Sequence, residues 1–280
     1  MKLGVVIEAT DSSLRAVLSQ AARIGAAGVQ LEAAGELSPD RLTQTGRRDI
    51  RTLLRSLGLE LTALLCPLRR GLDVAADLQP RIERVKKVMS LGEDLGSRIT
   101  VVDLPPIPPE SERPTTPMQV SAGGIILGAA PVQDPAATLR ESLRDLAAYG
   151  DRIGVTLALN AGSDSPEKLV EYLNRFDTGA LQVNYDPANF LSHGHDPLQA
   201  LAKLAGRIVH VHAREVRRNA AGQPVEVPLG AGDIDWMTLM AVLDSTGYRG
   251  WVVVKRTESH QRLTDLQNGL DLLRRFLRHP

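Results

Sequence analysis

The sequence has few aromatic residues, a single cysteine and no excess of either charge. Aromatic side chains make up 3% of its 280 residues, and 33 basic residues balance 33 acidic ones. Proteins that bind nucleic acids usually carry a basic surface, and those that bind single strands also stack bases on aromatic rings. This composition therefore predicts no nucleic-acid partner.

The lone cysteine and the lack of long apolar runs concern the compartment in which the protein works. Cys66 cannot form an internal disulfide, which favours a reducing compartment, and we expect it to be a small buried side chain. No segment approaches the ~20 apolar residues of a membrane span, and the first residues lack the apolar core of a signal peptide. We therefore expect a cytoplasmic protein with no membrane partner.

What the sequence does contain is a regular alternation of short apolar runs and amphipathic segments of helical length. The predicted strands are Lys2–Ala9, Gly28–Glu32, Leu59–Cys66, Ile99–Leu104, Val155–Leu159, Ala180–Tyr185, Ile208–Val211 and Gly250–Val254. About eight strand–helix units without a break in composition are typical of a closed α/β barrel, the (β/α)8 or TIM barrel. We predict one such domain over residues 1–280. A doubly wound open sheet is the alternative, but it usually has a glycine-rich loop after its first strand, where this chain reads EATDSS.

A proline-rich insertion follows the fourth predicted strand. Prolines recur between Pro105 and Pro117, and an apolar, glycine-containing run covers residues 121–130. Proline fixes φ and removes a backbone donor, so this insertion is predicted to be a loop. It should lie over the carboxyl-end face of the barrel, either as a lid over a site or as a surface loop.

Polar side chains stand at the ends of the predicted strands, where a barrel brings them together. These residues are Glu8, Glu32, Cys66, Asp103, Asn160, Asp186, His212 and Lys255. His210 and His212 share one face of their strand because side chains alternate with a period of two. Two histidines on one face beside Asp186 predict a functional site.

Five segments of the chain carry a family resemblance. They are GVQLEAAG (28–35), VNYDPANF (183–190), IVHVHARE (208–215), PLGAGDIDW (228–236) and GYRGWVVV (247–254). Together they resemble the sugar phosphate isomerase/epimerase superfamily, the xylose isomerase-like TIM barrels. That superfamily includes ketose 3-epimerases, inosose dehydratases and hydroxypyruvate isomerases, with endonuclease IV a more distant relative. The resemblance implies a small carbohydrate-like ligand, and a homo-oligomer is compatible with it.

The resemblance also implies where a metal centre would lie. In those enzymes a divalent metal is held by a Glu ending strand five, an Asp ending strand six, a His on strand seven and a Glu ending strand eight. The Asp falls on Asp186 and the His on His212, whereas the two glutamate positions, which also shuttle the substrate proton, are Asn160 and Lys255. A neutral amide and an ammonium group cannot bind a dication as a carboxylate does, and they cannot take a proton from carbon as a carboxylate base does.

These replacements define the expected site. We expect no tightly bound metal and no cofactor, with Asp186 and His212 as remnant ligands. The alternative is a divalent cation (Mn, Mg, Co or Zn) at a weakened or shifted site that adds Glu32, Glu215 or Asp103. We further expect Lys255 to take the place of the metal, within hydrogen-bonding reach of Asp186 or Asn160, because a buried charge needs a partner.

Two functions remain open from the sequence. The first is a sugar isomerase, epimerase or dehydratase without the usual metal, in which Lys255 polarises a carbonyl, acts as a base or forms a Schiff base. The second is a non-catalytic barrel that binds a sugar-like ligand or serves as a structural subunit. The candidate catalytic residues are Asn160, Lys255 and His212. The candidate substrate-binding residues are Asp186, Asn189, His210, Glu215, Arg218 (or its neighbour Arg217) and Glu32.

Overall fold

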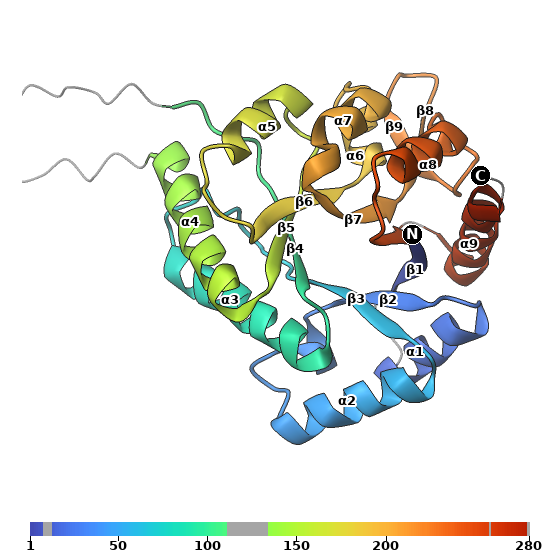
Figure 1. The fold of residues 1–280 in the computed structure, drawn as a ribbon, viewed down its shortest axis with the longest axis horizontal. Helices are drawn as coiled ribbons and strands as arrows, with labels where there is room; N and C mark the ends of the chain where they lie inside the picture. Colours follow the sequence, from blue (N-terminus) through green and yellow to red (C-terminus); the bar gives the residue numbers. More distant parts are fainter. Residues whose placement is uncertain (8–12, 111–133, 258, 279–280) are drawn as a thin grey trace, which may run out of the picture.

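A computed structural model describes residues 1–7, 13–110, 134–257 and 259–278. Eight parallel strands close into a barrel in the order β1-β10-β7-β6-β5-β4-β3-β2, which confirms the predicted fold (Figure 1). The strands are β1 (Lys2–Ile7), β2 (Gly28–Glu32), β3 (Glu60–Leu65), β4 (Ile99–Asp103), β5 (Thr156–Asn160), β6 (Leu181–Tyr185), β7 (Ile208–Ala213) and β10 (Trp251–Val254).

The helices lie around the outside of these strands (Figure 1). They are α1 (Leu14–Arg23), α2 (Gln44–Ser56), α3 (Leu78–Leu95), α4 (Pro135–Ile153), α5 (Pro166–Leu173), α6 (Pro187–Ser192), α7 (Pro197–Leu204), α8 (Trp236–Ser245) and α9 (Arg262–Arg278). Side-chain caps at Asp134, Ser165 and Asp235 accept hydrogen bonds from the first turns of α4, α5 and α8. These caps satisfy backbone donors that the helix leaves unpaired, so they fix where each helix begins.

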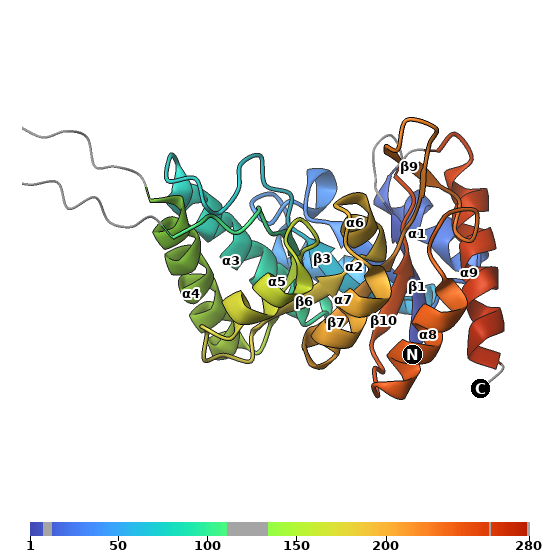
Figure 2. The ribbon, with the colours of Figure 1, turned by 90° about the horizontal axis from the view of Figure 1, so that it is seen from above.

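Two segments differ from the sequence prediction. The region after β6, expected to be one helix, forms α6 and α7, because Asp186 and Asp196 each cap a separate helix that opens with proline. The segment after β7, expected to be a long loop, contains the antiparallel hairpin of β8 (Glu215–Arg218) and β9 (Pro224–Val227). Figure 2 shows this hairpin projecting from the end of the barrel towards which β1 runs.

Part of the proline-rich insertion lies outside the described residues. Residues 105–110 follow β4 without regular secondary structure, whereas Pro117 and the run 121–130 are not described. The lid and the surface loop therefore both stay predictions, and Glu8 likewise lies outside the described residues. Within the described chain, no helix combines the length and the apolar character needed to cross a membrane.

The interior of the barrel is divided into an apolar layer and a polar layer. Ala63, Val101 and Ala158 are fully buried and form an apolar cluster of their own. Two residues further along their strands, the barrel-facing positions of β4 and β5 carry Asp103 and Asn160, as the period of two requires. The polar layer therefore lies at the carboxyl ends of the strands, where barrel enzymes have their sites.

Candidate functional site

The polar layer is built on residues that are direct neighbours across adjacent strands. Asp103 pairs with Asn160, Asn160 with Asn184, and Asn184 with His210 in the strand register. The side chains continue this row: Asn160 Nδ2 donates to Asp103 Oδ1 at 2.8 Å, and Asn184 Nδ2 donates to Asn160 Oδ1 at 3.0 Å. Asn160, one of our candidate catalytic residues, is thus a neutral link that holds both of its neighbours in place.

His210 is fully buried and both of its ring nitrogens have partners. Its Nδ1–H donates to Asn184 Oδ1 at 2.8 Å, and its Nε2 accepts from the Thr62 hydroxyl at 3.2 Å. Burial lowers the pKa of His210 well below its usual value, so the ring is neutral. We expected substrate contact, but these contacts give His210 the role of orienting Asn184.

His212 lies one step nearer the carboxyl end of β7 and is also fully buried. Its Nε2–H donates to Gln30 Oε1 at 2.8 Å, and its Nδ1 accepts from Asn184 Nδ2 at 3.1 Å. This tautomer follows from Asn184, whose oxygen is already taken by His210. Burial lowers the pKa of His212 to about 4, so at neutral pH it is an uncharged imidazole.

Asp186 is the one fully buried carboxylate in this network, and its counterion is Arg214. Arg214 Nε donates to Asp186 Oδ2 at 3.0 Å, while the backbone N–H of Asn189 donates to Asp186 Oδ1 at 3.2 Å and so caps α6. Arg214 Nη2 also donates to Asn189 Oδ1. Burial opposes ionisation, but the charge of Arg214, together with that of Lys255, outweighs it and holds the pKa of Asp186 well below its usual range.

The structure corrects our expectation for Lys255. Neither Asp186 nor Asn160 is a hydrogen-bond partner of Lys255, and within the described residues the ammonium group has no hydrogen bond or ion pair. Lys255 is half-buried just beyond β10, and its backbone N–H donates to Ala213 O. Its charge still lowers the pKa values of Asp186 and His212. Arg214, and not Lys255, is the cation beside Asp186, because its planar guanidinium group reaches the carboxylate and the Asn189 side chain together.

The two side chains that could hold a divalent metal here, Asp186 and His212, already have other partners. Among the described residues, no group of three or more His, Cys, Asp and Glu side chains comes together as ligands do. Asp186 is committed to Arg214 and to the cap of α6, and the free lone pair of His212 accepts from Asn184. A dication would have to displace a guanidinium that already neutralises the only buried carboxylate of the network.

Glu215, a candidate substrate-binding residue, anchors a loop. Both carboxylate oxygens accept hydrogen bonds, from Trp236 Nε1 at 2.7 Å and from the backbone N–H groups of Val216, Gly230 and Ile234, each at 3.2 Å. Four donors leave little capacity for a ligand. We therefore interpret Glu215 as the residue that fixes the 228–236 segment against β8.

Two further candidates lie apart from the Asp186 cluster. The Arg218 guanidinium donates to the backbone carbonyls of Gly222 and Leu191, both at 3.0 Å, and so ties the hairpin to α6. We interpret Arg218 as a structural residue. Glu32 ends β2 and lines a separate cavity with several arginines.

Sequence reasoning missed Arg214, Asn184 and Gln30, although the period of two could have found them. Arg214, the residue directly after β7, shares the parity of His210 and His212. Asn184 shares the parity of Asp186, and Gln30 that of Glu32. Each of the three therefore faces the barrel interior beside a residue that we had selected.

Comparison with known proteins identifies the family. A sequence model of the xylose isomerase-like TIM barrel matches residues 18–276. The chain belongs to this family. Among solved structures of xylose isomerase-like barrels, the xylose isomerase domain protein from Planctomyces limnophilus is similar with a TM-score of 0.81 and 21% identity, over 98% of this chain and 96% of that one. A D-tagatose 3-epimerase-like protein has a TM-score of 0.75 and 15% identity, over 99% and 97% of the two chains.

Curated relatives match over shorter stretches. An inosose dehydratase from Geobacillus thermodenitrificans is 30% identical over 128 residues, which is 40% of this chain and 43% of that protein. The rhizopine catabolism protein MocC from Rhizobium meliloti is 30% identical over 130 residues, or 40% of each chain. The matched stretches thus span less than half of the length of these relatives. Together with the family model, they support placing this chain in a sugar isomerase/epimerase-like family.

Proposed function

We propose that this protein binds a small sugar, ketose or cyclic polyol at the carboxyl-end face of the barrel, with the Arg214 guanidinium where relatives place a divalent cation. The observation that carries this proposal is the ion pair between Arg214 and the fully buried Asp186. It fixes a guanidinium group, with its hydrogen-bond donors, at the site without a metal. Membership of a sugar isomerase/epimerase-like family supports a carbohydrate-like ligand.

The donors around Arg214 suit hydroxyl and carbonyl oxygens. Within the described residues, Arg214 Nη1 has no hydrogen-bond partner, because Nε and Nη2 serve Asp186 and Asn189. Lys255 adds a second cation nearby that is not committed to a carboxylate. Sugar oxygens accept hydrogen bonds well from such charged donors.

Titration with D-fructose, D-tagatose and myo-inositol, in the presence of EDTA, tests the proposal. We expect saturable binding that EDTA does not weaken, and an affinity loss of about ten-fold or more in Arg214→Met, because a charged hydrogen bond to the ligand is lost. Arg55→Met is the control, since Arg55 is exposed on α2 and does not belong to the Asp186 cluster. Elemental analysis accompanies the titration, and one tightly held metal ion per chain would overturn the proposal.

A specific observation also favours a second function, a lysine-dependent isomerase, epimerase or dehydratase reaction. Lys255 is half-buried at the end of β10 and has no hydrogen bond or ion pair among the described residues. A lysine amine can attack a ketose carbonyl with loss of water to give a Schiff base, which borohydride reduces to a stable secondary amine. Mass spectrometry should then find a sugar adduct on Lys255 that Lys255→Met abolishes. Sugar binding without adduct or turnover would leave the non-catalytic function.

The remaining expectations extend this proposal. A cytoplasmic location fits the single cysteine, Cys66, which is buried and whose pKa burial raises to about 12. A homo-oligomer stays a prediction from the family resemblance. Light scattering of the purified chain measures its oligomeric state directly.

A further inference from the structure

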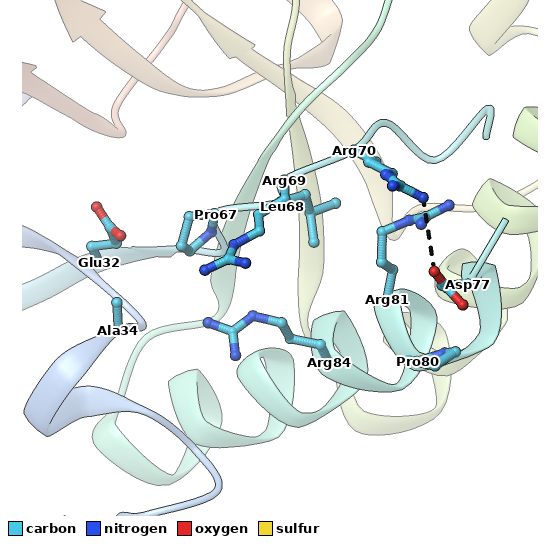
Figure 3. Close-up of a pocket in the computed structure, with 10 residues that line it drawn as sticks. All are labelled: Glu32, Ala34, Pro67, Leu68, Arg69, Arg70, Asp77, Pro80, Arg81 and Arg84. Carbon is cyan, nitrogen blue, oxygen red and sulfur yellow. Dashed lines mark ion pairs between the residues drawn. The ribbon is translucent and has the colours of Figure 1, made fainter.

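A cavity of about 810 Å³ lies beside α3, at the carboxyl ends of β2 and β3 (Figure 3). Its volume is in the range of pockets that hold small organic ligands. Glu32, the last residue of β2, lines it, and Gln30 of the same strand contacts His212. The cavity therefore lies at the same end of the barrel as the polar network but is formed by other residues.

The lining of this cavity is strongly basic in an otherwise neutral chain. Arg69, Arg70, Arg81 and Arg84 line it together with two carboxylates, which leaves two positive charges in excess. One carboxylate, Asp77, lies 3.8 Å from Arg70, and both side chains are more than half exposed. Such an exposed pair neutralises little, so the positive potential of the cavity remains.

Two of the arginines are held in place by neutral groups. Arg84 Nη2 donates to Ala33 O at 2.9 Å, and Arg81 Nη1 donates to Ala76 O at 2.6 Å while its Nη2 donates to Val74 O. Carbonyl oxygens orient a guanidinium group without cancelling its charge. The two forks on α3 are thus preorganised, which lowers the entropy cost of binding an anion.

Figure 3 shows how the four guanidinium groups are distributed around the cavity. Arg69 and Arg84 point into the part nearer Glu32, and Arg70 and Arg81 into the part nearer Asp77. Arg69 is exposed and, within the described residues, has no hydrogen bond or ion pair. Several arginine forks around one space match the oxygens of a phosphoryl group, which accepts paired hydrogen bonds.

We propose that this cavity binds the phosphoryl group of a small phosphorylated molecule, with Arg69, Arg81 and Arg84 as its main contacts. The excess of two positive charges matches a phosphate monoester dianion, and the volume leaves room for an organic body. None of these arginines belongs to the Asp186 cluster. The site therefore goes beyond the proposed sugar binding and can fail or succeed independently of it.

Isothermal titration with D-fructose 6-phosphate, and with inorganic phosphate as competitor, tests this site in the full chain. We expect D-fructose 6-phosphate to bind and inorganic phosphate to displace it. Arg69→Gln and Arg84→Gln should each weaken binding about ten-fold or more through lost charged contacts. Arg55→Gln is the matched control, because Arg55 is an exposed arginine on α2 outside the cavity.

Three results would overturn the proposal. The first is no saturable binding of D-fructose 6-phosphate up to ~10 mM, a concentration that detects even weak sites. The second is an equal loss of binding in Arg55→Gln, which would show that binding depends only on the overall charge of the protein. The third is displacement by succinate as effective as by phosphate, which indicates a carboxylate site. Arg69→Gln removes an exposed side chain, so its folding is secure, and it should leave binding of unphosphorylated D-fructose unchanged.

Discussion

Replacement of Arg214 by methionine should destabilise the fold, because it leaves a buried carboxylate without its counterion. Asp186 is fully buried, and Arg214 Nε lies 3.0 Å from its Oδ2, with the arginine side chain 17% exposed. Removal of one partner of a buried pair typically costs about 3–5 kcal/mol. Because the arginine retains some contact with solvent, we expect the low end, about 3 kcal/mol. For a chain of this length that is a fall in Tm of about 5 °C.

A double-mutant cycle separates this ion pair from general damage. In Asp186→Asn with Arg214→Met the orphaned charge is gone, and Asn retains the oxygen that caps α6. The double variant should therefore regain about 2 kcal/mol relative to the sum of the single losses. Urea unfolding followed by circular dichroism measures each free energy of unfolding.

The exposed pair of Asp244 and Arg249 provides the control cycle. Its N–O distance is also 3.0 Å, but the two side chains are 60% and 64% exposed. Solvent screens such a pair, so its coupling should be close to zero. Equal coupling in the two cycles, or additive losses for Asp186 and Arg214, would refute the inference that burial makes Arg214 the counterion of Asp186.

Further predictions concern pH, backbone conformation and loop anchoring. The pKa of His212 is about 4 in the folded chain against 6.5 in the unfolded one, so the unfolded chain binds the extra proton and stability falls as pH drops from 6.5 to 4, by about 3 kcal/mol. Urea unfolding across this window should show a smaller pH slope in His212→Gln than in the unmodified chain, and an unchanged slope contradicts the assignment. Gly162→Ala should lower the free energy of unfolding by about 1–3 kcal/mol, since φ is +141° and the new Cβ would lie 2.6 Å from the Cβ of Asn189 in α6. Gly206→Ala is the control, because a Cβ there would have no atom within 4 Å. Equal melting temperatures of the two variants would contradict the strain at Gly162. Glu215→Gln should lower the free energy of unfolding by about 2 kcal/mol, because its amide nitrogen would face backbone or indole donors. Thermal unfolding measures this loss, and an unchanged melting temperature would show that Glu215 is not needed as an anchor.

Much of the architecture follows from local sequence signals. Apolar runs of strand length, capping residues such as Ser165 and Asp235, and proline in the first helical turn all act over a few residues. They predicted the barrel and bounds such as those of β2 and α3. The hairpin of β8 and β9 was missed because each strand has only four residues, too few for an alternation of apolar and polar side chains to stand out.

The candidate site was predictable to the level of strand and face. Asp186 and His212 lie where the strand ends placed them, and the period of two also accounts for Glu215, which has the opposite parity to His212 and so faces away from the interior. Parity gives the side of the sheet. It does not give the partner of a side chain that several neighbours can reach.

The sequence by itself determined the barrel and the polar layer at its carboxyl end, including the Asn160 and Lys255 side chains at two of its strand ends. Only the tertiary structure decided that Arg214, rather than Lys255, neutralises Asp186, and that arginines from β3's loop and α3 surround one cavity. The physical reason is distance. Ion pairs form within about 4 Å, and which cation comes that close depends on how separate strands and helices pack, not on spacing along the chain.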